Sequence, residues 1–137
     1  MTVAASCCAL TACAEQRNSD ATWQITEVHT DPAKPGGLPQ DVSAVMVLGT
    51  KTVTGDTGCA PFQGKVEFDK LDQPTKATFS KVRYKVTDCV GAGRYFHDAL
   101  VTLLDGEFAV KKSDTELLLT KEPAGLDAPS IRLVATR

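Results

Sequence analysis

Several features are missing from this sequence of 137 residues, and each absence excludes a class of protein. No run of about 20 apolar residues occurs, so no segment is suited to span a bilayer as a helix. Positive charge is not in excess, because 15 lysines and arginines face 17 aspartates and glutamates and the net charge is −2. The cations are mixed with acids, for example from Glu107 to Glu116, as on solvated strand faces. We therefore expect no nucleic-acid binding, which needs a basic stripe.

Residues of the common catalytic and cofactor motifs are scarce as well. Two histidines, His29 and His97, are too few for a His-rich metal cluster, and we place His97 on the surface or at the boundary of a helix. No G-x-S-x-G elbow occurs, and the stretch from Gly49 to Gly55 lacks the spacing of a phosphate-binding loop. We expect no enzyme activity, no cofactor and no metal. A catalytic triad assembled only in space stays open at this point.

The most informative stretch lies near the start of the chain. Leu10-Thr11-Ala12-Cys13, a Leu and two small residues before a Cys, resembles the lipobox of bacterial lipoproteins. It predicts a signal peptide over residues 1–12, a lipid on the Cys13 thiol and a flexible polar tether over residues 13–22. The leader is short and uncharged, which indicates a translation start upstream of Met1 or a truncated chain. The alternative is an ordinary disordered N-terminus.

The other cysteines agree with export from the cytosol. Cys7 and Cys8 leave with the signal peptide, so that Cys59 and Cys89 are the two thiols of the folded part. An even pair outside the cytosol most simply forms a disulfide, and we expect a Cys59–Cys89 bond. Two buried free thiols are the alternative. A redox-active pair is not favoured, because the C-x-x-C spacing is absent.

Apolar periodicity predicts strands through most of the chain. A continuous apolar run from Val42 to Leu48 is consistent with a strand buried on both faces, and the Pro- and Gly-rich stretch from Asp31 to Gln40 must be a loop. The apolar face of Ala77 to Val86 switches sides near Lys81, which predicts a β-bulge there. The other expected strands are Trp23 to Val28, Lys51 to Gly55, Lys65 to Phe68, Glu107 to Lys111, Glu116 to Lys121 and Ser130 to Thr136, with a polar turn from Lys111 to Thr115.

One segment has the period of a helix. Phe96, Leu100, Leu103 and Leu104 recur at helical spacing, which predicts a helix over about 92–105 that Gly106 ends in a left-handed conformation. About 125 residues remain after the leader (137 minus 12), enough for one domain over 23–137. We therefore expect a mainly β fold, β-rich α+β, in which an antiparallel, partly closed barrel-like sheet of about seven or eight strands carries one helix over an opening or edge.

The order of these landmarks resembles a known family, the META or HslJ-like domain of bacterial envelope proteins. The resemblance covers Trp23 to about Thr136. It rests on several short motifs in the family's order: Trp23-Gln24-Ile25, Gly58-Cys59-Ala60, Phe62-Gln63-Gly64, Thr87-Asp88-Cys89, Phe96 to Leu104, Leu117-Leu118-Leu119 and Ile131-Arg132-Leu133. Ala60 stands where the family usually has Asn. The resemblance implies a β-rich fold with one helix and an envelope location, and it implies no established reaction.

Two loops are candidates for a binding surface. The stretch from Gly55 to Phe62 would be fixed by the disulfide and could present Asp56 and Phe62 to a partner. The alternative is a structural role, in which Phe62 seals the end of the barrel and the glycines satisfy turn geometry. The loop from Asp31 to Gln40 is either a recognition element or a simple connection between strands.

Three hypotheses about function follow. The favoured one is a monomeric, non-catalytic envelope lipoprotein, held to a membrane through lipid at Cys13, whose domain binds an envelope protein or wall component or serves in envelope maintenance. The second is a carrier that holds a small apolar ligand in a barrel cavity. The third is an extracytoplasmic hydrolase, which requires titratable groups with shifted pKa values meeting in one cleft.

Overall fold

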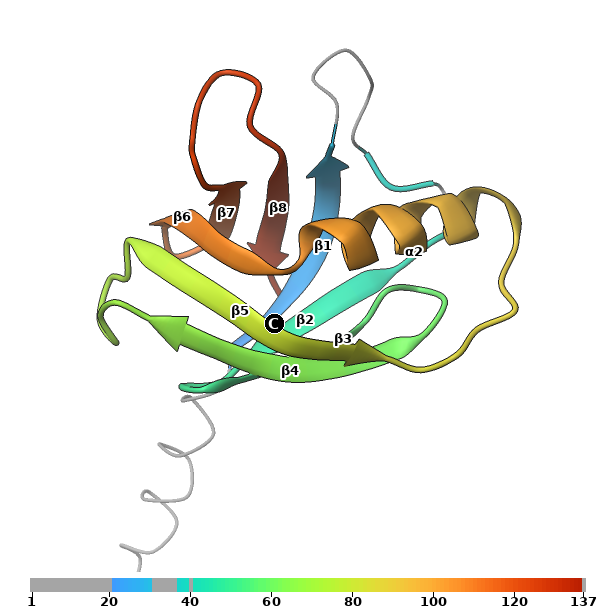
Figure 1. Cartoon of the computed structure of the whole chain (residues 1–137), viewed down its shortest axis with the longest axis horizontal. Helices are drawn as coiled ribbons and strands as arrows, with labels where there is room; N and C mark the ends of the chain where they lie inside the picture. Colours follow the sequence, from blue (N-terminus) through green and yellow to red (C-terminus); the bar gives the residue numbers. More distant parts are fainter. Residues whose placement is uncertain (1–20, 31–36, 40, 137) are drawn as a thin grey trace, which may run out of the picture.

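The computed structural model describes residues 21–30, 37–39 and 41–136, and within them the chain winds into a closed barrel (Figure 1). Each strand pairs with the next in antiparallel fashion, and the first strand closes the ring by pairing with the last. The strands are β1 (Ala21–His29), β2 (Ala44–Leu48), β3 (Thr52–Asp56), β4 (Pro61–Phe68), β5 (Lys76–Tyr84), β6 (Gly106–Lys112), β7 (Glu116–Lys121) and β8 (Ser130–Ala135), and the helix α2 (Gly91–Leu103) lies between β5 and β6. The expected mainly β, antiparallel barrel with one helix is confirmed, and its ring is complete rather than partly closed.

One row of apolar side chains from each strand fills the interior of the barrel, because successive residues of a strand point to opposite faces. Phe79 and Phe108 meet edge to face near the middle, with ring centroids 5.5 Å apart. Around them lie side chains that are fully buried: Ile25, Met46, Val53, Val66, Leu119, Ile131 and Leu133. Filling of this kind is expected of an eight-stranded barrel, whose interior is just wide enough for side chains.

The second strand corrects one expectation. The run from Val42 to Leu48 was expected to be buried on both faces, but β2 begins at Ala44, and its two faces differ. Ala44, Met46 and Leu48 are buried, whereas Val45 and Val47 are only half-buried. The reason is that a single closed sheet has one inner face, so the outer valines meet only their neighbours on the sheet surface.

The bulge expected near Lys81 is confirmed. Gln63 of β4 pairs with Arg83 of β5, but Lys65 pairs with Ser80, so that Lys81 and Val82 together oppose Gly64. Lys81 has a positive φ of 54°, as an extra residue in a bulged strand can require. A β-carbon on Gly64 would lie 2.7 Å from Val82 Cα, so the bulge and the glycine depend on each other.

The helix and the first strand begin and end at slightly different residues from those expected. The helix was expected over about 92–105 with Gly106 at its end, but α2 spans Gly91–Leu103 and Leu104 is its cap residue. Gly106 does have a left-handed φ of 85°, but it opens β6 instead. The helix ends at this cap residue because Leu104, whose N–H makes the last helical bond to the Leu100 carbonyl, has a ψ of 73° that lies outside the helical range. The structure also places Ala21 and Thr22, expected in the tether, in β1.

The two ends of the barrel differ. At one end α2 lies across the opening and buries Phe96, Leu100 and Leu103 in the core (Figure 1). The opposite end, which we call the mouth, is formed by the β2–β3 turn, the β4–β5 loop, the β6–β7 turn and the first residues of β1. In the described part of the chain, no helix has the length and apolarity needed to cross a membrane.

A disulfide fastens the helix to the barrel. It joins Cys59, in the turn between β3 and β4, to Cys89, two residues before α2, as expected from the sequence. Both sulfurs pack against the first turn of the helix, where a β-carbon on Gly93 would lie 3.4 Å from Cys89 Sγ and 3.6 Å from Cys59 Sγ. The bond therefore ties the long β5–β6 connection to the rim that it covers.

We predict that the double substitution Cys59→Ala and Cys89→Ala lowers the free energy of unfolding by about 3.6 kcal/mol, the chain-entropy value for this sequence separation of 30. Urea unfolding of both proteins measures the difference. Reductant should destabilise the wild-type protein by a similar amount and leave the double variant unchanged. A wild-type protein insensitive to reductant would contradict the prediction.

Candidate functional site

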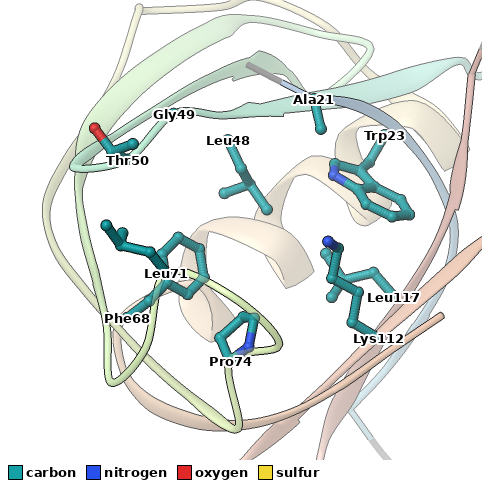
Figure 2. A pocket seen from close by; sticks show the side chains of 10 residues that line it. All are labelled: Ala21, Trp23, Leu48, Gly49, Thr50, Phe68, Leu71, Pro74, Lys112 and Leu117. Carbon is teal, nitrogen blue, oxygen red and sulfur yellow. The ribbon is translucent and has the colours of Figure 1, made fainter. Parts of the chain in front are cut away.

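The mouth contains a pocket of about 340 Å³, and Figure 2 looks into it. The side chains that line it come from five of the strands, β1, β2, β4, β6 and β7, and from the turns that join them. Most are apolar: Trp23, Leu48, Phe68, Leu71, Pro74 and Leu117. The polar side chains of the lining are Thr50 and Lys112. The pocket at the mouth is therefore mostly apolar, with the Lys112 ammonium group at its side.

The floor of the pocket is rigid, because it is the upper surface of the packed core. Trp23, Leu48 and Leu117 stand at the mouth ends of inward-facing rows, and each is buried. Trp23 pairs across the sheet with Met46 of β2, which is fully buried. The interior of the barrel is thus filled, and the hollow is confined to its mouth.

One wall of the pocket is the β4–β5 loop, which a single carboxylate holds closed. Asp69 accepts hydrogen bonds from the backbone N–H of Thr75 at 2.9 Å, the Thr75 hydroxyl at 2.6 Å and the Lys76 N–H at 3.0 Å. The hydrogen bond from the Thr75 hydroxyl is the main reason that the pKa of Asp69 lies well below its ordinary value of 3.8. The clamp fixes Leu71 and Pro74 beside the pocket, although the Leu71 side chain is 79% exposed.

Two lysines extend the inward-facing rows, one at each end of the barrel. On β7 the row of Leu117 and Leu119 continues to Lys121, whose ammonium group donates to the Leu103 carbonyl at 3.3 Å and to the Asp105 carbonyl. This cation sits at the C-terminal end of α2, where the helix dipole favours positive charge. It also lies 4.9 Å from the centroid of the Phe108 ring.

Lys112 is the corresponding residue at the mouth. On β6 the inward row of Phe108 and Val110 continues to Lys112, which lines the pocket, and Figure 2 shows its nitrogen turned toward Trp23. Among the residues that the structure describes, no hydrogen bond or ion pair engages this ammonium group. Lys112 was expected in a polar turn on a solvated face, but it is the last residue of β6 and pairs with Leu117 of β7. Strand alternation from Phe108 through Val110 was the signal that could have identified it.

The structure corrects the expectation for His97. It was expected on the surface or at the boundary of the helix, but it is buried, only 6% exposed, because it faces the barrel together with Phe96 and Leu100. Its Nδ1 lies 2.7 Å from Thr57 Oγ1, and that oxygen accepts the N–H groups of Cys59 and Ala60 at 3.1 Å each. The hydroxyl also lies 3.4 Å from the Ala60 carbonyl oxygen, which can accept its proton, while the 2.7 Å contact links it to the His97 ring. His97 therefore supports the disulfide-bearing turn.

The other candidate residues from the sequence make packing or hydrogen-bond contacts within the fold. Phe62 is buried with its ring centroid 5.3 Å from that of Tyr84, which fits the explanation that it seals the barrel end. Asp56 accepts the N–H of Gly58 within the turn, and His29 lies 3.0 Å from the carboxylate of Glu27 on the same strand. Cys13 and most of the loop from Asp31 to Gln40 lie outside the described residues.

The groups with shifted pKa values do not meet. Burial raises the pKa of the Tyr84 hydroxyl above its ordinary value of 10.0, and this residue ends β5 beneath the helix. Asp69 lies before the start of β5, whereas Tyr84 lies at its end. Because a strand rises about 3.3 Å per residue, the length of β5 separates the two groups. Within the described ranges no three metal-ligating side chains gather either.

Comparison with known proteins places the chain among barrels of this shape. No family model matches the sequence, and no curated protein matches it. An NMR structure of a protein from Burkholderia xenovorans covers 99% of this chain and 94% of its own, with 15% identity and a TM-score of 0.65. A second NMR structure covers 82% of this chain and 87% of its own, with 13% identity and a TM-score of 0.56. At these identities the likeness shows a shared fold and carries no function.

We predict that Asp69→Asn destabilises the protein near neutral pH and that the difference from the wild type shrinks in acid. A carboxyl whose pKa is lowered by folding stabilises the fold above its ordinary pKa of 3.8, and this stabilisation is lost as the pH falls below that value. Urea unfolding at neutral pH and at about pH 2 measures the effect. Asp72→Asn, in an exposed position of the same loop, is the control and should show no such trend.

Proposed function

We propose that this protein is a non-catalytic, lipid-anchored binding domain of the bacterial cell envelope, of the META or HslJ-like kind, which engages an envelope protein or wall component. The observation that carries the proposal is a filled barrel whose covering helix is fastened by a disulfide. Disulfides persist in oxidising compartments outside the cytosol, which fits the lipobox ending at Cys13. The order of motifs from Trp23 to Thr136 adds the family resemblance.

The position of the first strand supports a tethered arrangement. Ala21 begins β1 at the mouth and pairs with Leu48, and it follows Cys13 by eight positions in the sequence. The last strand returns to the same end, where Thr136 bonds to the backbone of Thr22. Both ends of the domain therefore lie on one side, and the helix-covered end is left on the other for contact with a partner.

The anchoring is tested by substituting Cys13→Ser in the protein expressed from its own gene in its native host. We expect the variant to leave the membrane fraction, because stable anchoring requires about two acyl chains or an equivalent second signal. Membrane fractionation with mass analysis of the mature N-terminal peptide measures this. Cys8→Ser is the matched control, since it removes a neighbouring thiol and should leave the protein on the membrane. Unchanged retention of the Cys13 variant would refute the anchoring.

A second candidate function is that of a carrier for a small apolar ligand, and the mouth pocket is the observation that favours it. Its volume of about 340 Å³ falls at the low end of the range of roughly 300–1,000 Å³ for ligand pockets. Because the core below is filled, the ligand would sit in the mouth rather than deep in the barrel. Such a site takes one short aliphatic or ring-shaped group.

The carrier function is tested with decanol, an uncharged aliphatic alcohol. Trp23 is the single tryptophan of the chain and lines the pocket, so its fluorescence reports occupancy directly. We expect decanol to change this fluorescence in the wild type and not in Ala21→Phe, which fills the mouth from an exposed position. Thr22→Phe, on the outer face of the same strand, is the control and should bind normally. Equal responses of all three proteins would contradict the carrier function.

A further inference from the structure

We propose that the mouth pocket binds a single aliphatic chain that ends in an anionic group, with the chain against the apolar floor and the anion at Lys112. This inference rests on the carrier function and specifies the chemical class of its ligand. It commits to one free amphiphile in the pocket and not to the surface of a bilayer.

The apolar part of the site is preformed. Trp23 is 4% exposed and Leu117 is 2% exposed, so the packed core holds both in place without a ligand. Phe68 and Pro74 form the opposite wall, because the Asp69 clamp fixes the loop that carries Pro74. A preformed apolar pocket binds an alkyl chain without paying the entropy of ordering its own walls.

The charged part of the site follows from the contrast between the two inward-row lysines. Lys121 occupies the helix-covered end, where two backbone carbonyls and the Phe108 ring face its ammonium group. Lys112 occupies the same kind of position at the mouth, but in the described residues no carbonyl or carboxylate is bonded to it. The fold thus supplies partners for one of these cations and leaves the other beside a hollow that an anion can enter.

Three acids near the mouth, Asp69, Asp72 and Asp114, do not act as anionic partners of Lys112. The oxygens of Asp69 accept the three hydrogen bonds of the β4–β5 loop. Asp72 and Asp114 are exposed, and neither lines the pocket. None of these three acids therefore pairs with Lys112. A ligand carboxylate beside the Lys112 ammonium group would make a charge-assisted hydrogen bond.

The experiment compares decanoate, decanol and decylammonium, each below its micelle concentration, on the full chain carrying Cys13→Ser so that no attached lipid competes. Binding is followed by Trp23 fluorescence and by calorimetry. We expect decanoate to bind about fivefold more tightly than decanol, as for a partly exposed charge-assisted bond, and decylammonium to bind most weakly. Lys112→Gln should abolish the preference for decanoate and leave decanol binding unchanged.

Two variants control for general effects of charge. Lys111→Gln removes the neighbouring cation, which points to the outside of the barrel, and should keep the preference. Lys112→Arg keeps the charge and should keep it too. If decanol and decanoate bind equally and Lys112→Gln changes neither, the anionic class is wrong while the carrier function stands. Vesicles that contain anionic lipid are tested alongside; if no decyl compound binds, or if the protein binds only to these vesicles, the carrier function fails as well.

Discussion

The pairing of β1 with β8 is the constraint on which the rest of this structure depends. It runs from Trp23 opposite Ala135 to His29 opposite Ser130 and turns the sheet into a ring without edges. Once the ring is closed, each strand residue is either inside or outside, and alternation along the strand decides which. The interior then has room for one apolar row per strand, which explains why Val45 and Val47 are left on the outer surface.

A closed ring still has two open ends, and among the residues that the structure describes a helix covers one of them. Within the described residues, the helix α2 belongs to the β5–β6 connection, crosses its end and is fastened by the Cys59–Cys89 bond. The connections at the opposite end, such as the turn around Thr50, are too short to cross the opening. The pocket at the mouth therefore follows from the distribution of connection lengths.

Much of this fold could be predicted from the sequence, because local patterns report which face of a strand is buried. The bulge at Lys81 was visible as a change in the parity of apolar residues, and the Cys59–Cys89 bond followed from counting thiols. Closure of the ring, burial of His97 and the pocket depend on how distant segments meet. No local period reports that a helix residue will face a turn 40 positions away, as His97 faces Thr57.

The proposed lipid anchor and the proposed ligand site belong to the same end of the molecule, the mouth. Ala21 lies at the mouth, and the eight steps of chain back to Cys13 span at most about 29 Å when fully extended. If Cys13 carries the lipid, the mouth stays within that distance of the membrane whatever path the tether takes. An amphiphile that leaves or enters the bilayer would then meet the open end of the barrel before the helix-covered one. Anchoring would thus raise the local concentration of the class of ligand that Trp23 and Lys112 are placed to bind.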